Sequence, residues 1–224
     1  MDQEIDVSVV VPTYNEAGNL PPLIRRLARA LRGRRWEVVV VDDGSPDGTG
    51  KVAEILARKY PVRLVQRGKR GGLSSAVVEG WRHAGGRVLV VMDADLQHPP
   101  ELVPELVMKV EEGNDLVLAC RTRWVGWRGA ASKLMGELVR TLLHLPVRDP
   151  HSGFFALRRV VGRIKPRGYK ILLECLVRGR YRRVAEVFYS QGKRKWGRSK
   201  WGVREGWEYL RQLLDLLGYS KGGR

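Results

Sequence analysis

The first half of the chain alternates short runs of branched apolar residues with segments of helical period, and this alternation constrains the fold more than any other feature. Nearly continuous Val, Leu and Ile is typical of strands that are buried on both faces, as they are in parallel sheets. Strands that alternate with helices favour an α/β fold, a mostly parallel sheet with helices on both faces. The five runs are residues 5–11, 37–41, 62–65, 88–92 and 116–119.

The segment after the first run shows the helical period most clearly. Five apolar residues fall on one face of a helix, Asn19 stands at a capping position, and Pro21 and Pro22 occupy the first turn. We therefore expect a surface helix there and similar helices between the later runs. The five apolar residues are Leu20, Leu23, Ile24, Leu27 and Leu31.

Polar, glycine-rich and acidic residues follow the predicted strands. The carboxyl ends of parallel strands share one edge of a sheet, and ligands of open α/β sheets bind at that edge. We therefore expect the ligand site there. The segments that reach this edge are residues 12–16, 42–49, 66–72, 93–98 and 121–123.

Asp93 and Asp95 project carboxylates from the end of the fourth predicted strand, and Gln97 adds a neutral oxygen. Hard oxygen ligands at this spacing suit Mg²⁺ or Mn²⁺, with substrate phosphates completing the coordination. The same residues could equally form a polar turn that caps the next helix, which Pro99 and Pro100 support. The residues alone leave both interpretations open.

Asp42 and Asp43 end the second predicted strand, where adjacent carboxylates repel each other unless a ligand or turn amides offset the repulsion. We expect Asp42 to contact a ligand and Asp47 to cap the next helix. Three glycines after the third strand could cradle a phosphate at a helix start, but the Gly-Lys-Ser/Thr ending of a P-loop does not follow them. These glycines are Gly68, Gly71 and Gly72.

Five motifs occur in a specific order along the chain. They are Pro12-Thr13-Tyr14-Asn15-Glu16, Asp42-Asp43-Gly44-Ser45 with Asp47-Gly48-Thr49, Gly71-Gly72-Leu73, Asp93-Ala94-Asp95-Leu96-Gln97-His98-Pro99-Pro100 and Ser152-Gly153-Phe154. This series resembles family 2 glycosyltransferases of the GT-A fold, and dolichol-phosphate mannose synthases most closely. The resemblance, over residues 7–200, implies a single GT-A catalytic domain spanning residues 1–224. Residues 1–120 would bind the nucleotide sugar, and residues 121–224 would form a basic half that faces the acceptor and the membrane.

The resemblance also implies roles for individual residues. Nucleotide contacts would come from Pro12, Tyr14, Glu16, Asp42 and Asp93, and the divalent metal, Mg²⁺ or Mn²⁺, would be bound by Asp93, Asp95 and Gln97. Donor and acceptor phosphates would be contacted by the catalytic set of Asp95, Arg121, Arg128, Ser132, Arg194 and Lys200. Arg194 and Lys200 belong to a segment that resembles a family loop closing over the diphosphate, although Trp201 stands where the family usually has Leu.

The excess positive charge lies entirely in the second half of the chain. Residues 1–120 contain 16 Lys and Arg against 17 Asp and Glu, whereas residues 121–224 contain 25 against 7. Such a half concentrates phosphates, nucleic acids or anionic lipid surfaces near it. A phosphate monoester acceptor is already anionic, so it needs cations to hold it rather than a general base to ionise it. Neither His98 nor His151 is then required for the transfer.

Motifs and charge together predict an inverting, metal-dependent glycosyltransferase that acts on a polyprenyl or dolichyl phosphate, with GDP-mannose as the donor that the resemblance favours. One alternative is the same fold using UDP-glucose or another nucleotide sugar, with a polyprenyl phosphate or glycan acceptor, because Asp42 and Asp43 do not distinguish guanine from uracil. An alternative of another class is a basic nucleic-acid-binding protein. The acidic strand ends argue against it, so we expect no nucleic-acid partner.

Any membrane contact is expected to be peripheral or made through a transmembrane partner subunit. No apolar run approaches the roughly 18 residues that cross a bilayer, and the acidic N-terminus does not resemble a secretory signal. Cys120 and Cys175 lie in apolar stretches as core thiols, which favours a cytoplasmic protein at the cytosolic face of the membrane. A terminal amphipathic helix could pack on the core, lie on a membrane or bind that partner. Its apolar stripe is Val203, Trp207, Leu210, Leu214 and Leu217.

Overall fold

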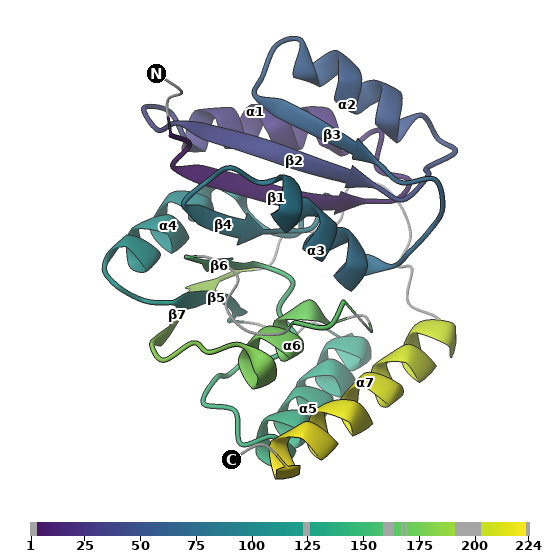
Figure 1. The fold of residues 1–224 in the computed structure, drawn as a ribbon, viewed down its shortest axis with the longest axis vertical. Coiled ribbons are helices and arrows are strands. Elements are labelled where there is room, and N and C mark those ends of the chain that lie inside the picture. The colour runs from purple at the N-terminus through teal and green to yellow at the C-terminus, as the bar shows by residue number, and fades with distance from the viewer. Residues whose placement is uncertain are drawn as a thin grey trace.

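One seven-stranded sheet organises the part of the chain that the computed structural model describes, residues 4–122, 126–158, 164–166, 168, 170–190 and 203–222. The strand order is β3-β2-β1-β4-β6-β5-β7 (Figure 1). The strands are β1 (Val7–Thr13), β2 (Trp36–Asp42), β3 (Val62–Gln66), β4 (Val88–Val91), β5 (Leu116–Arg121), β6 (Phe155–Leu157) and β7 (Val184–Tyr189).

The five strands predicted from the apolar runs are all present as β1 to β5. β1 pairs in parallel with β2 and with β4, and β2 pairs in parallel with β3. The side chains of β1 and β4 are buried throughout, because helices cover the sheet on both faces. The predicted α/β fold with a mostly parallel sheet is therefore confirmed.

β6 departs from the parallel pattern that the five runs predict. It lies between β4 and β5 and is antiparallel to both, while β7 pairs in parallel with the other side of β5. As a result β4 and β5 are separated by a strand, although both end at the same edge of the sheet. The segment that leads into β6 also reaches this edge.

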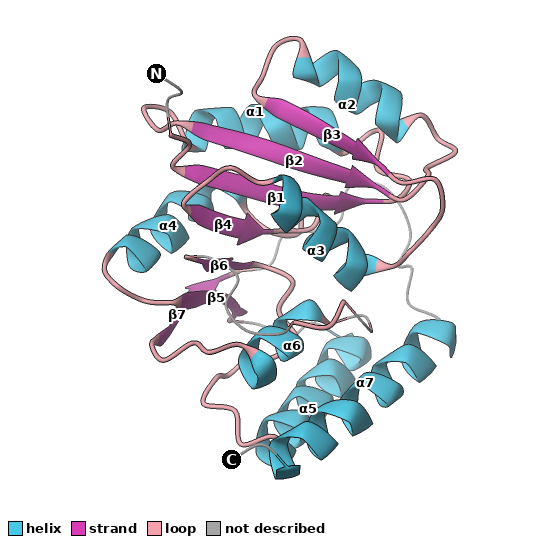
Figure 2. Ribbon diagram, viewed as in Figure 1, coloured by secondary structure: helices cyan, strands magenta, loops and turns pink. Residues whose placement is uncertain are grey.

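Helices cover both faces of the sheet, and Figure 2 draws α5 and α7 beyond α6 at one end of the molecule. Apolar residues of α1, α2 and α4 share a core cluster with one face, and those of α3, α5, α6 and α7 share a second cluster with the other. The helices are α1 (Leu20–Ala30), α2 (Thr49–Ala57), α3 (Leu73–His83), α4 (Val103–Glu111), α5 (Gly126–Leu142), α6 (Ile171–Arg178) and α7 (Val203–Gly222), with a 3₁₀ turn η1 (Pro100–Leu102) before α4.

α7 packs on the core with a different face from the predicted stripe. Leu213 and Leu216 enter the second core cluster, whereas Trp207 and Leu214 are 61% and 62% exposed. Of the rest of the stripe, Leu210 is exposed, Leu217 is partly buried, and the side chain of Val203 lies outside the described residues. Within the part of the chain that is described, no helix has the length and apolar character needed to cross a membrane.

Candidate active site

The loops after β1 and β2 are tied together at the carboxyl edge of the sheet. Ser45 Oγ accepts the backbone N–H of Asn15, and Thr49 Oγ1 accepts that of Glu16, each at 2.9 Å. Asn19 stands at the N-cap of α1 as predicted, but its side chain donates to Glu16 Oε2 at 2.6 Å and so braces the loop. The predicted nucleotide contacts on this strand end and loop are Pro12, Tyr14 and Glu16.

Asp42 is buried at the end of β2, and protein donors bind both of its oxygens. Thr13 Oγ1 donates to Oδ1 at 3.1 Å, and the backbone N–H of Ser45 donates to Oδ2 at 3.0 Å. These donors offset the carboxylate charge, and through them Asp42 stabilises the turn after β2 even without a ligand. Gly48, rather than Asp47, is the N-cap residue of α2, but Asp47 still accepts the backbone N–H of Thr49, the first residue of the helix, at 3.0 Å.

Asp43 anchors the glycine segment that follows β3. Its Oδ2 accepts the backbone N–H groups of Gly71 and Gly72 at 3.2 and 3.0 Å, and its Oδ1 lies 2.8 Å from Arg67 Nη1. Burial raises the pKa of Asp43, against the opposing effect of the Arg67 charge. Two of the amide groups that could have cradled a phosphate are therefore bound to a carboxylate of the protein itself.

Asp93, Asp95 and Gln97 occupy the loop between β4 and η1. Asp95 Oδ1 accepts the backbone N–H of Gln97 at 3.1 Å, and Leu96 has a left-handed φ of 62°, which turns the loop sharply. Burial raises the pKa of Asp93; His98 opposes this rise and the Asp95 carboxylate adds to it. The two carboxylates are thus close enough to repel each other.

This donor set fits a divalent cation that is shared with a ligand. Among the described residues, no three or more His, Cys, Asp or Glu side chains are grouped as a metal site. Two carboxylates and an amide oxygen are nevertheless what Mg²⁺ or Mn²⁺ commonly uses when phosphates and water complete its coordination. A bound cation would offset both the burial and the smaller repulsion by Asp95 that raise the pKa of Asp93.

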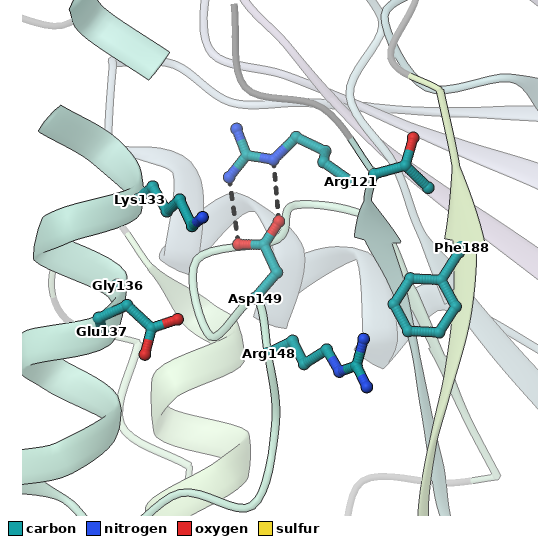
Figure 3. A pocket seen from close by; sticks show the side chains of 8 residues that line it. Arg121, Lys133, Gly136, Glu137, Arg148, Asp149 and Phe188 are labelled. Atoms are coloured by element: carbon teal, nitrogen blue, oxygen red, sulfur yellow. Dashed lines mark hydrogen bonds and ion pairs between the residues drawn. The ribbon is translucent and has the colours of Figure 1, made fainter. Parts of the chain in front are cut away.

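Arg121 ends β5 and is fixed by Asp149, which sequence analysis did not single out. The guanidinium donates from Nε to Asp149 Oδ2 at 2.8 Å and from Nη2 to Oδ1 at 3.1 Å (Figure 3). The pair lies in a cavity of about 530 Å³ between the end of β5, α5 and β7. Its lining consists of Arg121, Thr122, Lys133, Gly136, Glu137, Arg148, Asp149 and Phe188.

α7 contacts the loop that runs beside this edge. The Tyr209 hydroxyl lies 2.7 Å from His151 Nε2, and Lys170 Nζ donates to the backbone oxygen of His151 at 3.0 Å. Gln212 binds the backbone of Lys170 twice, accepting its N–H at 3.3 Å and donating to its oxygen at 3.0 Å. Burial and the Lys170 charge lower the pKa of His151 to about 4. The terminal helix therefore helps to place a loop of the site.

The remaining predicted phosphate contacts lie in the basic half. Ser132 lies on α5 next to Lys133 and is partly buried. The side chain of Arg128 and the whole of Arg194 and Lys200 lie outside the described residues, so their roles stay predictions.

The sequence was also compared with known proteins. The sequence model described as Glycosyl transferase family 2 matches residues 8–161. The chain belongs to this family. Among its relatives, this family 2 chain is 44% identical over 228 residues to the dolichol-phosphate mannosyltransferase of Pyrococcus furiosus, a match that covers 96% of this chain and 64% of that protein. It is 37% identical over 243 residues to the dolichol-phosphate mannosyltransferase of Saccharomyces cerevisiae, covering 97% of this chain and 89% of the yeast protein.

Solved structures agree with the family assignment of this glycosyl transferase family 2 chain. The glucosyl-3-phosphoglycerate synthase of Mycobacterium tuberculosis, crystallised with Mn²⁺, uridine diphosphate and phosphoglyceric acid, superposes with a TM-score of 0.74 at 25% identity. The match covers 97% of this chain and 79% of that one. The predicted GT-A fold is thereby confirmed. The chain spans just under two thirds of the Pyrococcus relative, and its own substrates are considered next.

Proposed function

We propose that the chain is an inverting, metal-dependent glycosyltransferase that transfers mannose from GDP-mannose to a polyprenyl phosphate, such as dolichyl phosphate, at the cytosolic membrane surface. One observation carries the proposal: the carboxylates that follow β4 and the arginine that ends β5 lie at the same edge of one sheet. Relatives named dolichol-phosphate mannosyltransferase support the choice of sugar and acceptor.

The carboxylate side would bind the donor. A cation held by Asp93, Asp95 and Gln97 would stabilise the negative charge that develops on the diphosphate as the bond to the sugar breaks. Asp93 and Asp95 act as ligands in this proposal and neither gives nor takes a proton. The Arg70 guanidinium lies 4.7 Å from the centre of the Tyr14 ring, which adds a cation near the predicted nucleotide contacts.

The cavity side would bind the acceptor. Lys133 and Arg148 contribute further positive charge to the cavity around Arg121, and the half-exposed Phe188 ring adds an apolar wall. Cations next to an apolar surface suit a phosphate joined to a hydrocarbon chain. Because such a phosphate is already ionised, it can attack the sugar carbon directly from the side opposite the leaving diphosphate, which inverts that carbon.

Exposed apolar side chains on α5 and α7 support a membrane-facing surface. Leu134 of α5 is 74% exposed, and Met135, Leu138 and Leu142 are exposed on the same helix. Trp207, Leu210 and Leu214 of α7 are exposed as well, and Figure 1 draws α5 and α7 at the same end of the molecule. Large exposed apolar patches mark protein or membrane contacts. Cys120 and Cys175 are buried free thiols, which suits the cytosolic side.

Product formation tests the proposal. Purified protein, Mn²⁺, GDP-[¹⁴C]mannose and dolichyl phosphate should yield label that partitions into chloroform–methanol and is released by mild acid as mannose. Asp95→Ala should abolish the product, while Glu105→Ala, which removes an exposed carboxylate of α4, should leave it unchanged. Full activity of the Asp95→Ala variant would contradict the metal assignment.

A nucleotide titration tests the donor. Any ligand of the native state raises the melting temperature by mass action. GDP with Mn²⁺ should therefore raise it at lower concentration than UDP with Mn²⁺. A larger shift with UDP would favour the alternative in which the donor is a UDP-sugar.

A further inference from the structure

The His98 ring faces Asp93 with both of its nitrogen atoms. His98 Nδ1 accepts the backbone N–H of Asp93 at 3.1 Å, and His98 Nε2 lies 3.9 Å from Asp93 Oδ2. Because Nδ1 is an acceptor, the neutral ring carries its proton on Nε2. At 3.9 Å the Nε2–H group is too far from the carboxylate for a hydrogen bond and close enough for charge–dipole attraction. One ring thus contacts the main chain and the side chain of the same residue.

Packing leaves the His98 ring little freedom to move. The ring is stacked on Phe154 with centroids 5.1 Å apart, and its edge meets Tyr189 at 6.1 Å. Phe154 and Tyr189 in turn contact each other edge to face, with centroids 6.0 Å apart, so the three rings form a closed aromatic cluster. His98 itself is buried. This cluster joins the Asp93 loop to the residue before β6 and to the end of β7.

Gly153 provides the room for this arrangement. A Cβ at position 153 would lie 3.1 Å from Asp93 Oδ2 and 3.3 Å from His98 Cε1, closer than such atoms normally approach. Ser152, its neighbour, is fixed because its Oγ donates to the backbone oxygen of Ala119 at 2.7 Å. The Ser152-Gly153-Phe154 motif therefore packs against the loop that carries Asp93 and His98.

We propose that His98 is a positioning residue, which orients the Asp93 carboxylate for cation binding. The His98 ring is in turn held in place by Phe154 and Tyr189, and the absence of a side chain at Gly153 leaves room for it. This inference rests on the proposed function, because Asp93 is a ligand only if the site binds a cation. Residues that contact a metal ligand fix its orientation, and mutating them typically lowers metal affinity about 10- to 100-fold. This proposal departs from the sequence interpretation, in which the transfer does not require His98.

Mn²⁺ binding provides the direct test. Free Mn²⁺ is measured by electron paramagnetic resonance at a fixed concentration of GDP, for the wild-type chain and for His98→Phe, which keeps a flat ring on Phe154 but loses both nitrogen contacts. We expect His98→Phe to bind Mn²⁺ at least about tenfold more weakly. The metal concentration for half-maximal activity should rise by a similar factor, while the rate at saturating Mn²⁺ changes little. His98→Asn, whose amide oxygen can replace Nδ1, should bind Mn²⁺ more tightly than His98→Phe.

Controls separate positioning from folding. His83→Phe changes an exposed histidine of α3 and should leave Mn²⁺ binding as in wild type. If His98→Phe does not fold, Gly153→Ala provides the second route, because its methyl group displaces the Asp93 carboxylate and should weaken Mn²⁺ binding in the same way. Wild-type affinity for Mn²⁺ in a folded His98→Phe or Gly153→Ala chain would overturn this inference alone. No Mn²⁺ binding by the wild-type chain would instead overturn the metal site of the proposed function, and this inference with it.

Discussion

The Arg121–Asp149 pair should contribute measurably to stability, because it is buried and bidentate. The side chains are only 18% and 3% exposed, and two hydrogen bonds of 2.8 and 3.1 Å join them. Asp149→Asn keeps the shape of the side chain but turns one acceptor into a donor that faces the guanidinium. A hydrogen bond to a charged group contributes about 1.5–3 kcal/mol, so losing one should lower the free energy of unfolding by about 2 kcal/mol. For a chain of this size the melting temperature should fall by about 4–8 °C.

Glu137→Gln provides a matched control within the same cavity. Glu137 pairs with Arg140 through bonds of 3.0 and 2.7 Å, but both side chains are exposed, so the loss should be below about 0.5 kcal/mol. The assay is urea denaturation in 0.1 M and 1 M NaCl, where the Asp149→Asn effect should persist because salt screens buried pairs weakly. Losses that agree within error for the two variants would refute the reasoning from burial.

Three further predictions concern other parts of the molecule. Gly80→Ala should lower the free energy of unfolding by about 1–3 kcal/mol in denaturant titration, because the new Cβ would lie 2.3 Å from a side-chain methyl of Val10 and push α3 away from the sheet; unchanged stability would contradict this packing. Trp207→Ala should reduce cosedimentation with anionic lipid vesicles at unchanged melting temperature, whereas Ile55→Ala, an equally exposed apolar change on α2, should not reduce it. Hydrogen bonds from Arg35 lower the pKa of Asp6 from 3.8 to about 2, so the stability that its charge contributes is present above pH 4 and lost between about pH 4 and pH 2. In Asp6→Asn, the free energy of unfolding, measured by denaturant titration, should depend less on pH in that interval.

Sequence patterns predicted the parts of the fold that repeat a simple rule. Continuous Val runs such as that of β2 indicate strands buried on both faces, and each of the five predicted strands is found. β6 has three residues, Phe155–Leu157, too few for any period to be visible. α7 carries apolar residues around more than half of its circumference, so spacing could not reveal that Leu213 and Leu216, rather than Trp207 and Leu214, face the core.

The candidate site was predicted as far as its residues follow strands. Asp42, Asp93 and Arg121 were predicted as site residues because each stands at or just after the end of an apolar run, and the structure places all three at the carboxyl edge of the sheet. The contacts of Asp149 and His98 were not predicted, since they are made with partners 28 and 5 positions away along the chain, Arg121 and Asp93. No local pattern encodes such a pairing, although the position of His98 inside the Asp93 motif was a usable signal.

The reversed direction of β6 changes which segments of the chain can reach the carboxyl edge of the sheet. In a wholly parallel sheet, the chain reaches the carboxyl edge only where it leaves a strand. Here the chain also passes this edge before it enters β6. Residues 149–154 therefore lie between the end of β4, which Asp93 follows, and the end of β5 at Arg121. β4 and β5 are two strand spacings apart, about 10 Å, so this incoming segment fills the interval between them. Substitutions between the end of α5 and residue 149 would therefore change the position of residues 149–154, while β4 and β5 stay in place.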